Sequence, residues 1–294
     1  MRSFSILGDS ISTFDGCNPS GFRVYYEGER CAQTGVLSAA DTWWSHVIAK
    51  LGGKLLANSS FSGSLVEGAG FPAGSSQARI DALADGGAQP DVVIVLMGIN
   101  DYGWGGALAQ AAGRGNALPV DLNLDDIEPR TPAGASAGAV EGFCAAYALL
   151  LQRLRAAYPH AEVWCCTLCP GRVQGSLHPT FAWNLRGAPF RSYNDAIRAA
   201  ARQHDCRVAD LEAFGTDYEA VDGTHPTARG MRQLAAMVAA CIEGAEPDGA
   251  LLPDELFDAS LRSEELCPGK ACVGCEHARG TGSSWFLVCE RSRA

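Results

Sequence analysis

The side chains best suited to chemistry are a serine near the start of the chain and an aspartate–histidine pair near its end. Ser10 follows a short apolar run and the dipeptide Gly8-Asp9, which makes it the candidate nucleophile. A serine hydroxyl attacks a carbonyl effectively only when an adjacent base takes its proton. His225 can be that base if Asp222 accepts a hydrogen bond from the other ring nitrogen. These residue types predict acyl transfer through a covalent serine intermediate.

The elements that must position these residues alternate between strands and helices. Apolar runs predict strands at 3–7, 54–57, 91–97, 162–168 and 207–211, and helical patterns cover 43–51, 77–84, 140–158, 191–204 and 226–243. This alternation indicates a parallel sheet with crossover helices. Ligands of open parallel sheets bind just outside the carboxyl ends of the strands. Ser10 follows the first strand and is expected at that edge.

Four short blocks at predicted strand ends and before the last helix resemble, in their order, the SGNH (GDSL-type) hydrolase family. They are Gly8-Asp9-Ser10, Asn58 through Gly63, Gly98-Ile99-Asn100-Asp101 and Asp222-Gly223-Thr224-His225. Ile11 departs from the leucine that usually follows the serine in the family. One block alone would be a weak match, but four in order are specific, and the resemblance covers residues 2–243.

The resemblance implies a fold and a set of roles. The expected fold is a three-layer α/β/α sandwich around a mostly parallel five-stranded sheet, of flavodoxin-like type. Ser10, Asp222 and His225 are expected to catalyse ester hydrolysis without a cofactor. The oxyanion of the tetrahedral intermediate would be held by the backbone N–H groups of Ser10 and Gly63 and by the side chain of Asn100.

The substrate is less well defined by the sequence. Several aromatic residues fall near the expected site, where they either stack on a sugar, line an acyl pocket or simply pack: Trp43, Trp44, Phe61, Phe71, Trp104 and Trp183. The family includes carbohydrate esterases, lipases, lysophospholipases and thioesterases. We favour removal of an O-acetyl group from a carbohydrate-like molecule. The alternatives are a lysophospholipase or thioesterase, and a catalytically idle binding module.

The amino-acid composition and net charge narrow the classes of molecule that the protein is expected to bind. The 294 residues carry a formal net charge of −10 and are 47% hydrophobic, which suits a globular chain and argues against nucleic acid or an anionic membrane as partner. No apolar run approaches the roughly 20 residues of a membrane span. Strand and site begin at once, without a basic and apolar leader, so we expect a cytoplasmic protein acting on a small-molecule ester.

Two segments interrupt the regular pattern. We assign residues 1–245 to the hydrolase domain, with a Gly-, Ala- and Pro-rich insertion at 103–139 that is either a lid or a tolerated surface loop. Within it, Gly134 to Gly138 fits a Gly-x-Ser-x-Gly elbow. That motif requires a preceding strand, which is missing, so Ser136 is interpreted as linker. Residues 246–294 form a separate cysteine-rich extension.

The extension contains four cysteines with the spacing of a metal site: Cys267, Cys272, Cys275 and Cys289. Four thiolates with a Cys-x-x-Cys pair suit tetrahedral zinc, and metal binding would supply folding energy to a segment with a small core. The Cys-x4-Cys-x2-Cys spacing also matches plant-type iron–sulfur ligands. Free or disulfide-paired cysteines are the third interpretation.

Metal analysis of the purified full chain separates these interpretations. We expect about one zinc per chain and no visible absorbance, because thiolates bind zinc well and the zinc ion is colourless. Visible absorbance with bound iron would indicate a cluster instead. A chain purified without either metal would contradict both metal interpretations.

Overall fold

A five-stranded parallel sheet forms the centre of the protein. The structure is a computed structural model, and it describes residues 1–68, 70–104, 140–173, 190–249, 252–253, 255–257, 278–281 and 284–289, the last two ranges as backbone only. The strands of the sheet are β1 (Ser3–Gly8), β2 (Lys54–Ser60), β3 (Val92–Leu96), β4 (Glu162–Cys166) and β6 (Arg207–Ala209). They lie in the order β2-β1-β3-β4-β6, and every neighbouring pair is parallel. This order confirms the expected flavodoxin-like sheet.

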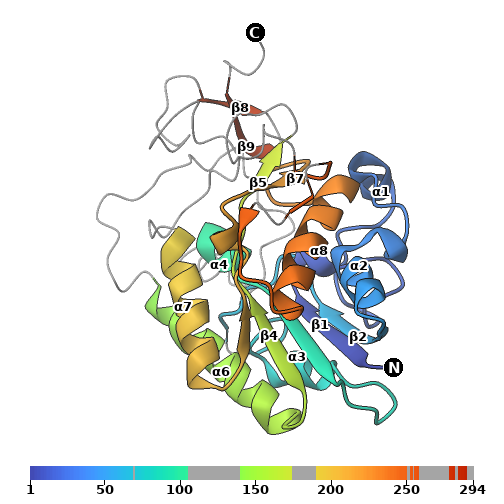
Figure 1. Cartoon of the computed structure of the whole chain (residues 1–294), viewed down its shortest axis with the longest axis vertical. Coiled ribbons are helices and arrows are strands. Elements are labelled where there is room, and N and C mark those ends of the chain that lie inside the picture. Colours follow the sequence, from blue (N-terminus) through green and yellow to red (C-terminus); the bar gives the residue numbers. More distant parts are fainter. Residues whose placement is uncertain are drawn as a thin grey trace.

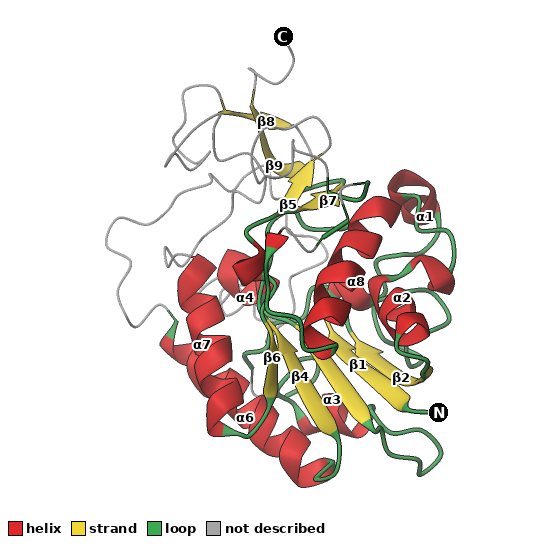
Figure 2. Cartoon of the chain, viewed as in Figure 1, coloured by secondary structure: helices red, strands yellow, loops and turns green. Residues whose placement is uncertain are grey.

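Helices cover both faces of the sheet (Figure 1). On one face lie α2 (Trp43–Lys50) and α8 (Ala228–Ile242). On the other lie α3 (Gln77–Asp81), α6 (Glu141–Ala157) and α7 (Phe190–Gln203). Figure 2 shows the resulting three layers, with the strands between two groups of helices. The predicted α/β/α sandwich is therefore confirmed.

Alternating side chains of the central strands fill two separate cores. Ile94 of β3 packs in the core shared with α2 and α8, whereas Val93 and Val95 pack in the core shared with α3, α6 and α7. Successive side chains of a strand point to opposite faces, so a strand covered on both faces is apolar throughout. This explains the continuous apolar run that made β3 easy to predict.

Several short elements lie outside the predicted strands and helices. They are α1 (Glu29–Thr34), α4 (Ile99–Trp104), the 3-10 turns Ser10–Ser12, Ala39–Asp41 and Glu212–Phe214, and the parallel pair β5 (Gly171–Val173) and β7 (Tyr218–Ala220). The start of α8 also differs from the prediction. Pro226 precedes the helix, and Thr227 caps it by accepting a hydrogen bond from the Gly230 amide at 3.1 Å.

Some predictions fall on parts of the chain outside the described residues. These are nearly all of the 103–139 insertion with Ser136, the residue Trp183, and three of the four tail cysteines, Cys267, Cys272 and Cys275. Cys289 ends the antiparallel pair β8 (Ala278–Thr281) and β9 (Ser284–Cys289). Within the described ranges, no helix is long and apolar enough to span a membrane. The domain boundary near 245 and the metal site stay predictions.

Candidate active site

The candidate nucleophile lies on a tight turn at the carboxyl end of β1. Asp9 caps the 3-10 turn that begins at Ser10, because its carboxylate accepts a hydrogen bond from the Ile11 amide at 3.0 Å. A Cβ on Gly8 would come within 2.4 Å of the Ser12 side chain, so only glycine permits this turn. The turn holds the Ser10 side chain at the sheet edge where the sequence predicted it.

Donors from other elements hold the far end of the same turn. The indole N–H of Trp43 donates to Ser12 Oγ at 3.1 Å, and that of Trp44 donates to the Ser12 carbonyl at 3.0 Å. The side-chain amide of Asn58 donates to the same carbonyl at 2.8 Å. Both tryptophans are buried, so the structure shows that they pack and support the turn.

Ser10, His225 and Asp222 form one continuous chain of hydrogen bonds. His225 Nε2 lies 2.9 Å from Ser10 Oγ, and Nδ1 lies 2.5 Å from Asp222 Oδ2. The other carboxylate oxygen, Oδ1, accepts from the backbone amides of His225 at 2.6 Å and Thr224 at 3.0 Å. The predicted nucleophile, base and orienting carboxylate thus meet, although 212 residues separate Ser10 from Asp222.

Local hydrogen bonding fixes both the charge of Asp222 and the shape of its turn. Burial alone would raise the pKa of Asp222, but the charge of His225 and the hydrogen bonds from His225 and Thr224 outweigh burial and lower it. Gly223 has a φ of +79°, a left-handed conformation that favours glycine. The carboxylate therefore stays ionised beside the imidazole at neutral pH.

The two expected oxyanion residues also come together. Gly63 occupies a turn after β2 with a φ of +79°, and Asn100 lies in the first turn of α4. The Asn100 side-chain amide donates to the carbonyl of Ser64, the residue after Gly63, at 3.0 Å. Asp101 accepts hydrogen bonds from the Val66 amide at 2.8 Å and the Glu67 amide at 3.1 Å. The second and third blocks are thus joined side by side.

A buried arginine that sequence reasoning missed links the first two blocks. The guanidinium of Arg79 donates to the carbonyls of Gly8 and Ser59, both at 2.6 Å, to the Pro72 carbonyl at 2.7 Å and to Ser64 Oγ at 3.1 Å. Burial lowers the pKa of Arg79 to about 9, and the charge of Asp9 acts in the opposite direction. Nothing in the helical pattern around residue 79 distinguishes this arginine from a surface one.

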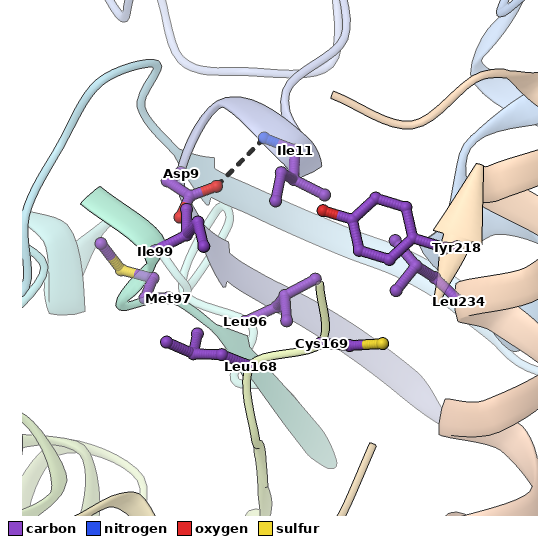
Figure 3. Close-up of a pocket in the computed structure, with 9 residues that line it drawn as sticks. All are labelled: Asp9, Ile11, Leu96, Met97, Ile99, Leu168, Cys169, Tyr218 and Leu234. Atoms are coloured by element: carbon purple, nitrogen blue, oxygen red, sulfur yellow. Dashed lines mark hydrogen bonds between the residues drawn. The ribbon is translucent and has the colours of Figure 1, made fainter. Parts of the chain in front are cut away.

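An apolar pocket lies beneath the nucleophile turn (Figure 3). Asp9 faces it together with Ile11, Leu96, Met97 and Ile99, among other residues. The free volume is about 10 Å³, so the pocket has room for one water molecule at most. Burial raises the pKa of Asp9 to about 6, although the Ile11 amide and the charges of His225 and Arg79 each lower it. The pocket is too small for a substrate, and its importance lies in its effect on Asp9.

The described part of the chain holds no candidate metal cluster, because its residues contain no group of three or more His, Cys, Asp or Glu side chains that could hold a metal ion. Eight of its cysteines are free thiols, and Cys289 is described only as backbone. The described site therefore consists of Ser10, His225 and Asp222 with the neighbouring donors.

Comparison with known proteins gives a family and a fold. The model of the GDSL-like lipase/acylhydrolase family matches residues 6–233. A GDSL-like lipase from Bacteroides ovatus is 23% identical, with 83% of this chain and 98% of that chain covered and a TM-score of 0.55. One from Bacteroides uniformis is 24% identical, with 82% and 95% covered and a TM-score of 0.54. No curated protein matches the chain.

Replacing Asp9 by Asn should change how stability depends on pH. The pKa of Asp9 is about 6 in the folded state against an ordinary value of 3.8, so its protonated form favours folding. Its contribution is complete below pH 4 and is lost as the pH rises through 6. Asn keeps an acceptor for the Ile11 amide without a charge. Relative to the wild type, Asp9→Asn should gain about 2 kcal/mol between pH 4 and pH 7.

Urea unfolding of both proteins at the two pH values measures this gain. Asp91→Asn is the matched control, because hydrogen bonds from Ser3 lower the pKa of Asp91, the opposite of the shift at Asp9. Relative to the wild type, that variant should not gain stability between pH 4 and pH 7. A pH-independent difference for Asp9→Asn would contradict the prediction.

Proposed function

The chain belongs to the GDSL-like lipase/acylhydrolase family and hydrolyses ester bonds, and we propose that it does so through an acyl intermediate on Ser10. The observation that carries this proposal is the continuous hydrogen-bond chain from Ser10 Oγ through His225 to Asp222. It supplies a nucleophile, a base within reach of its proton and a carboxylate that orients the base.

The proposed reaction has two halves. Ser10 Oγ attacks the ester carbonyl while His225 Nε2 takes the hydroxyl proton, and a tetrahedral oxyanion forms. The oxyanion collapses, the bond to the alcohol breaks, and His225 returns the proton to the leaving oxygen. Water then attacks the acyl-serine, again giving a proton to His225, and release of the acid restores Ser10. Asp222 stabilises the imidazolium that forms in each half.

We assign the oxyanion to three donors: the backbone N–H groups of Ser10 and Gly63 and one side-chain N–H of Asn100. The assignment is supported by the hydrogen bond from Asn100 to Ser64, which places the asparagine next to the Gly63 turn. One amide hydrogen of Asn100 is used in that bond and the second is left for the oxyanion. Loss of one such donor typically lowers kcat by about 100- to 1000-fold.

For the substrate we propose an O-acetyl ester of a carbohydrate-like molecule. Phe22, Phe61 and Phe71 form a cluster with ring centroids 5.2 to 5.8 Å apart, and Phe71 is 49% exposed. The Phe61 amide donates to the Gly8 carbonyl at 3.1 Å, so the cluster is attached to the nucleophile strand. An exposed aromatic face offers a sugar ring a surface on which to stack.

The expected cytoplasmic location is consistent with the free thiols of the described cysteine side chains.

Ser10→Ala should abolish turnover of p-nitrophenyl acetate, with kcat reduced by about 10⁴-fold or more, because the variant has no nucleophile. A fluorophosphonate probe should label the wild type and leave the variant unlabelled. Ser76→Ala is the matched control, since the buried Ser76 hydroxyl has no hydrogen-bond partner among the described residues. Turnover by Ser10→Ala at the wild-type rate would exclude Ser10, and an inert, unlabelled wild type would indicate a binding module.

A panel of acetylated sugars, lysophospholipids and acyl thioesters tests the substrate class, with Ser10→Ala as background. We expect acetylated sugars to have the highest kcat/KM. Phe71→Ala should raise their KM by about 3- to 10-fold while leaving ethyl acetate unaffected, because only the sugar stacks. Leu37→Ala removes another exposed apolar side chain and should change neither. A preference for lysophospholipid or thioester would replace the carbohydrate proposal.

A further inference from the structure

Tyr25 contacts both His225 and Asp222, although neither the motifs nor the sequence patterns single it out. Its ring lies flat against the His225 imidazole, with centroids 3.5 Å apart and an angle of 3° between the planes. Its hydroxyl donates to Asp222 Oδ2 at 3.3 Å, the oxygen that also faces His225 Nδ1. One side chain therefore contacts the base by its face and the orienting carboxylate by its edge.

Tyr25 is itself fixed to the nucleophile turn. Its backbone amide donates to Thr13 Oγ1 at 2.9 Å, and that hydroxyl donates to the Ser10 carbonyl at 3.0 Å. The ring is only 8% exposed and packs edge-on against Tyr26 at 5.0 Å. The Arg30 guanidinium lies over the Tyr25 ring, 4.4 Å from its centroid. These contacts connect the Tyr25 ring, and the His225 imidazole that lies against it, to the turn that carries Ser10.

We propose that Tyr25 is a positioning residue of the reaction, one that orients the His225 imidazole and stabilises the imidazolium; this inference rests on the proposed function. A positive ring is attracted to an aromatic face more strongly than a neutral ring is. The imidazolium exists only after His225 has taken the serine proton. The stack is therefore stronger in the transition state than before it, which raises kcat in preference to lowering KM.

The Tyr25 hydroxyl makes a separate and smaller contribution to the reaction. Burial, reinforced by the charge of Asp222, raises the pKa of Tyr25 well above its ordinary value, so the phenol stays protonated and remains a donor. As a donor it adds a fourth hydrogen bond to a carboxylate that already has three. That bond fixes the carboxylate, whereas the stack acts on the base. The two contributions can be removed separately.

Two substitutions separate them. Tyr25→Leu removes the stack and the hydroxyl and should lower kcat for p-nitrophenyl acetate by about 10- to 100-fold, with KM unchanged within about twofold. Tyr25→Phe keeps the stack and should lose only about 2- to 10-fold. The rate of fluorophosphonate labelling should fall in the same order. If Tyr25 acted only through its hydroxyl, Tyr25→Phe would lose as much activity as Tyr25→Leu.

Tyr158 provides the control for a purely structural effect. It is buried in the core on the opposite face of the sheet, and its hydroxyl donates to the Ile80 carbonyl at 2.8 Å. Tyr158→Leu and Tyr158→Phe should lower the melting temperature with kcat unchanged. A wild-type kcat for Tyr25→Leu, or a loss in Tyr25→Phe equal to that in Tyr25→Leu, would overturn the proposal.

A measurement without turnover keeps this inference distinct from the proposed function. In the wild type, the ring current of Tyr25 should shift the NMR signals of the His225 ring protons upfield. The signals should move downfield in Tyr25→Leu and stay in place in Tyr25→Phe. An unchanged signal in Tyr25→Leu would contradict the stacking even in an active enzyme. An inactive wild type with the expected shifts would contradict the proposed function and leave the positioning of His225 demonstrated.

Discussion

The site depends on a buried cation whose partners are mainly backbone carbonyls. The Arg79 guanidinium joins the end of β1 at Gly8, the end of β2 at Ser59 and the loop after Gly63 at Ser64 and Pro72. A buried charge is costly unless hydrogen bonds satisfy it, and a planar guanidinium offers five donors in a fixed geometry. Because Gly8 leads into Ser10 and Ser64 follows Gly63, one side chain sets the relative position of the nucleophile and the glycine assigned to the oxyanion.

The base reaches Ser10 by a different route. His225 and Asp222 lie on a turn between β7 and α8, and their hydrogen bonds to each other shape that turn. Tyr25 and Tyr26 connect this turn to the segment that follows Ser10, because the Tyr25 amide donates to Thr13 Oγ1. Tyr25 lies on His225, and the Tyr26 hydroxyl donates to the Pro226 carbonyl at 3.0 Å. The site is therefore held by an arginine on the oxyanion side and by a pair of tyrosines on the side of the base.

This division explains what could be predicted from the sequence. The sheet was predictable because strands buried on both faces are apolar throughout, and the four blocks because their residue types suit one chemistry in one order. Arg79 and Tyr25 were not predictable, since their partners lie far away along the chain and leave no local periodicity. Trp43 and Trp44 illustrate the same limit. Their position allowed substrate contact as well as packing, and the hydrogen bonds to Ser12 show that they support the turn.

Asp9 shows how these supports affect the chemistry. An asparagine could cap the turn as well as an aspartate, yet the chain places a carboxylate over an apolar pocket, where burial raises its pKa to about 6. The charges of Arg79 and His225 both act to keep Asp9 ionised. The nucleophile turn thus supplies the site with a carboxylate in addition to Asp222. Burial outweighs the two opposing charges, so the pKa of Asp9 stays above its ordinary value.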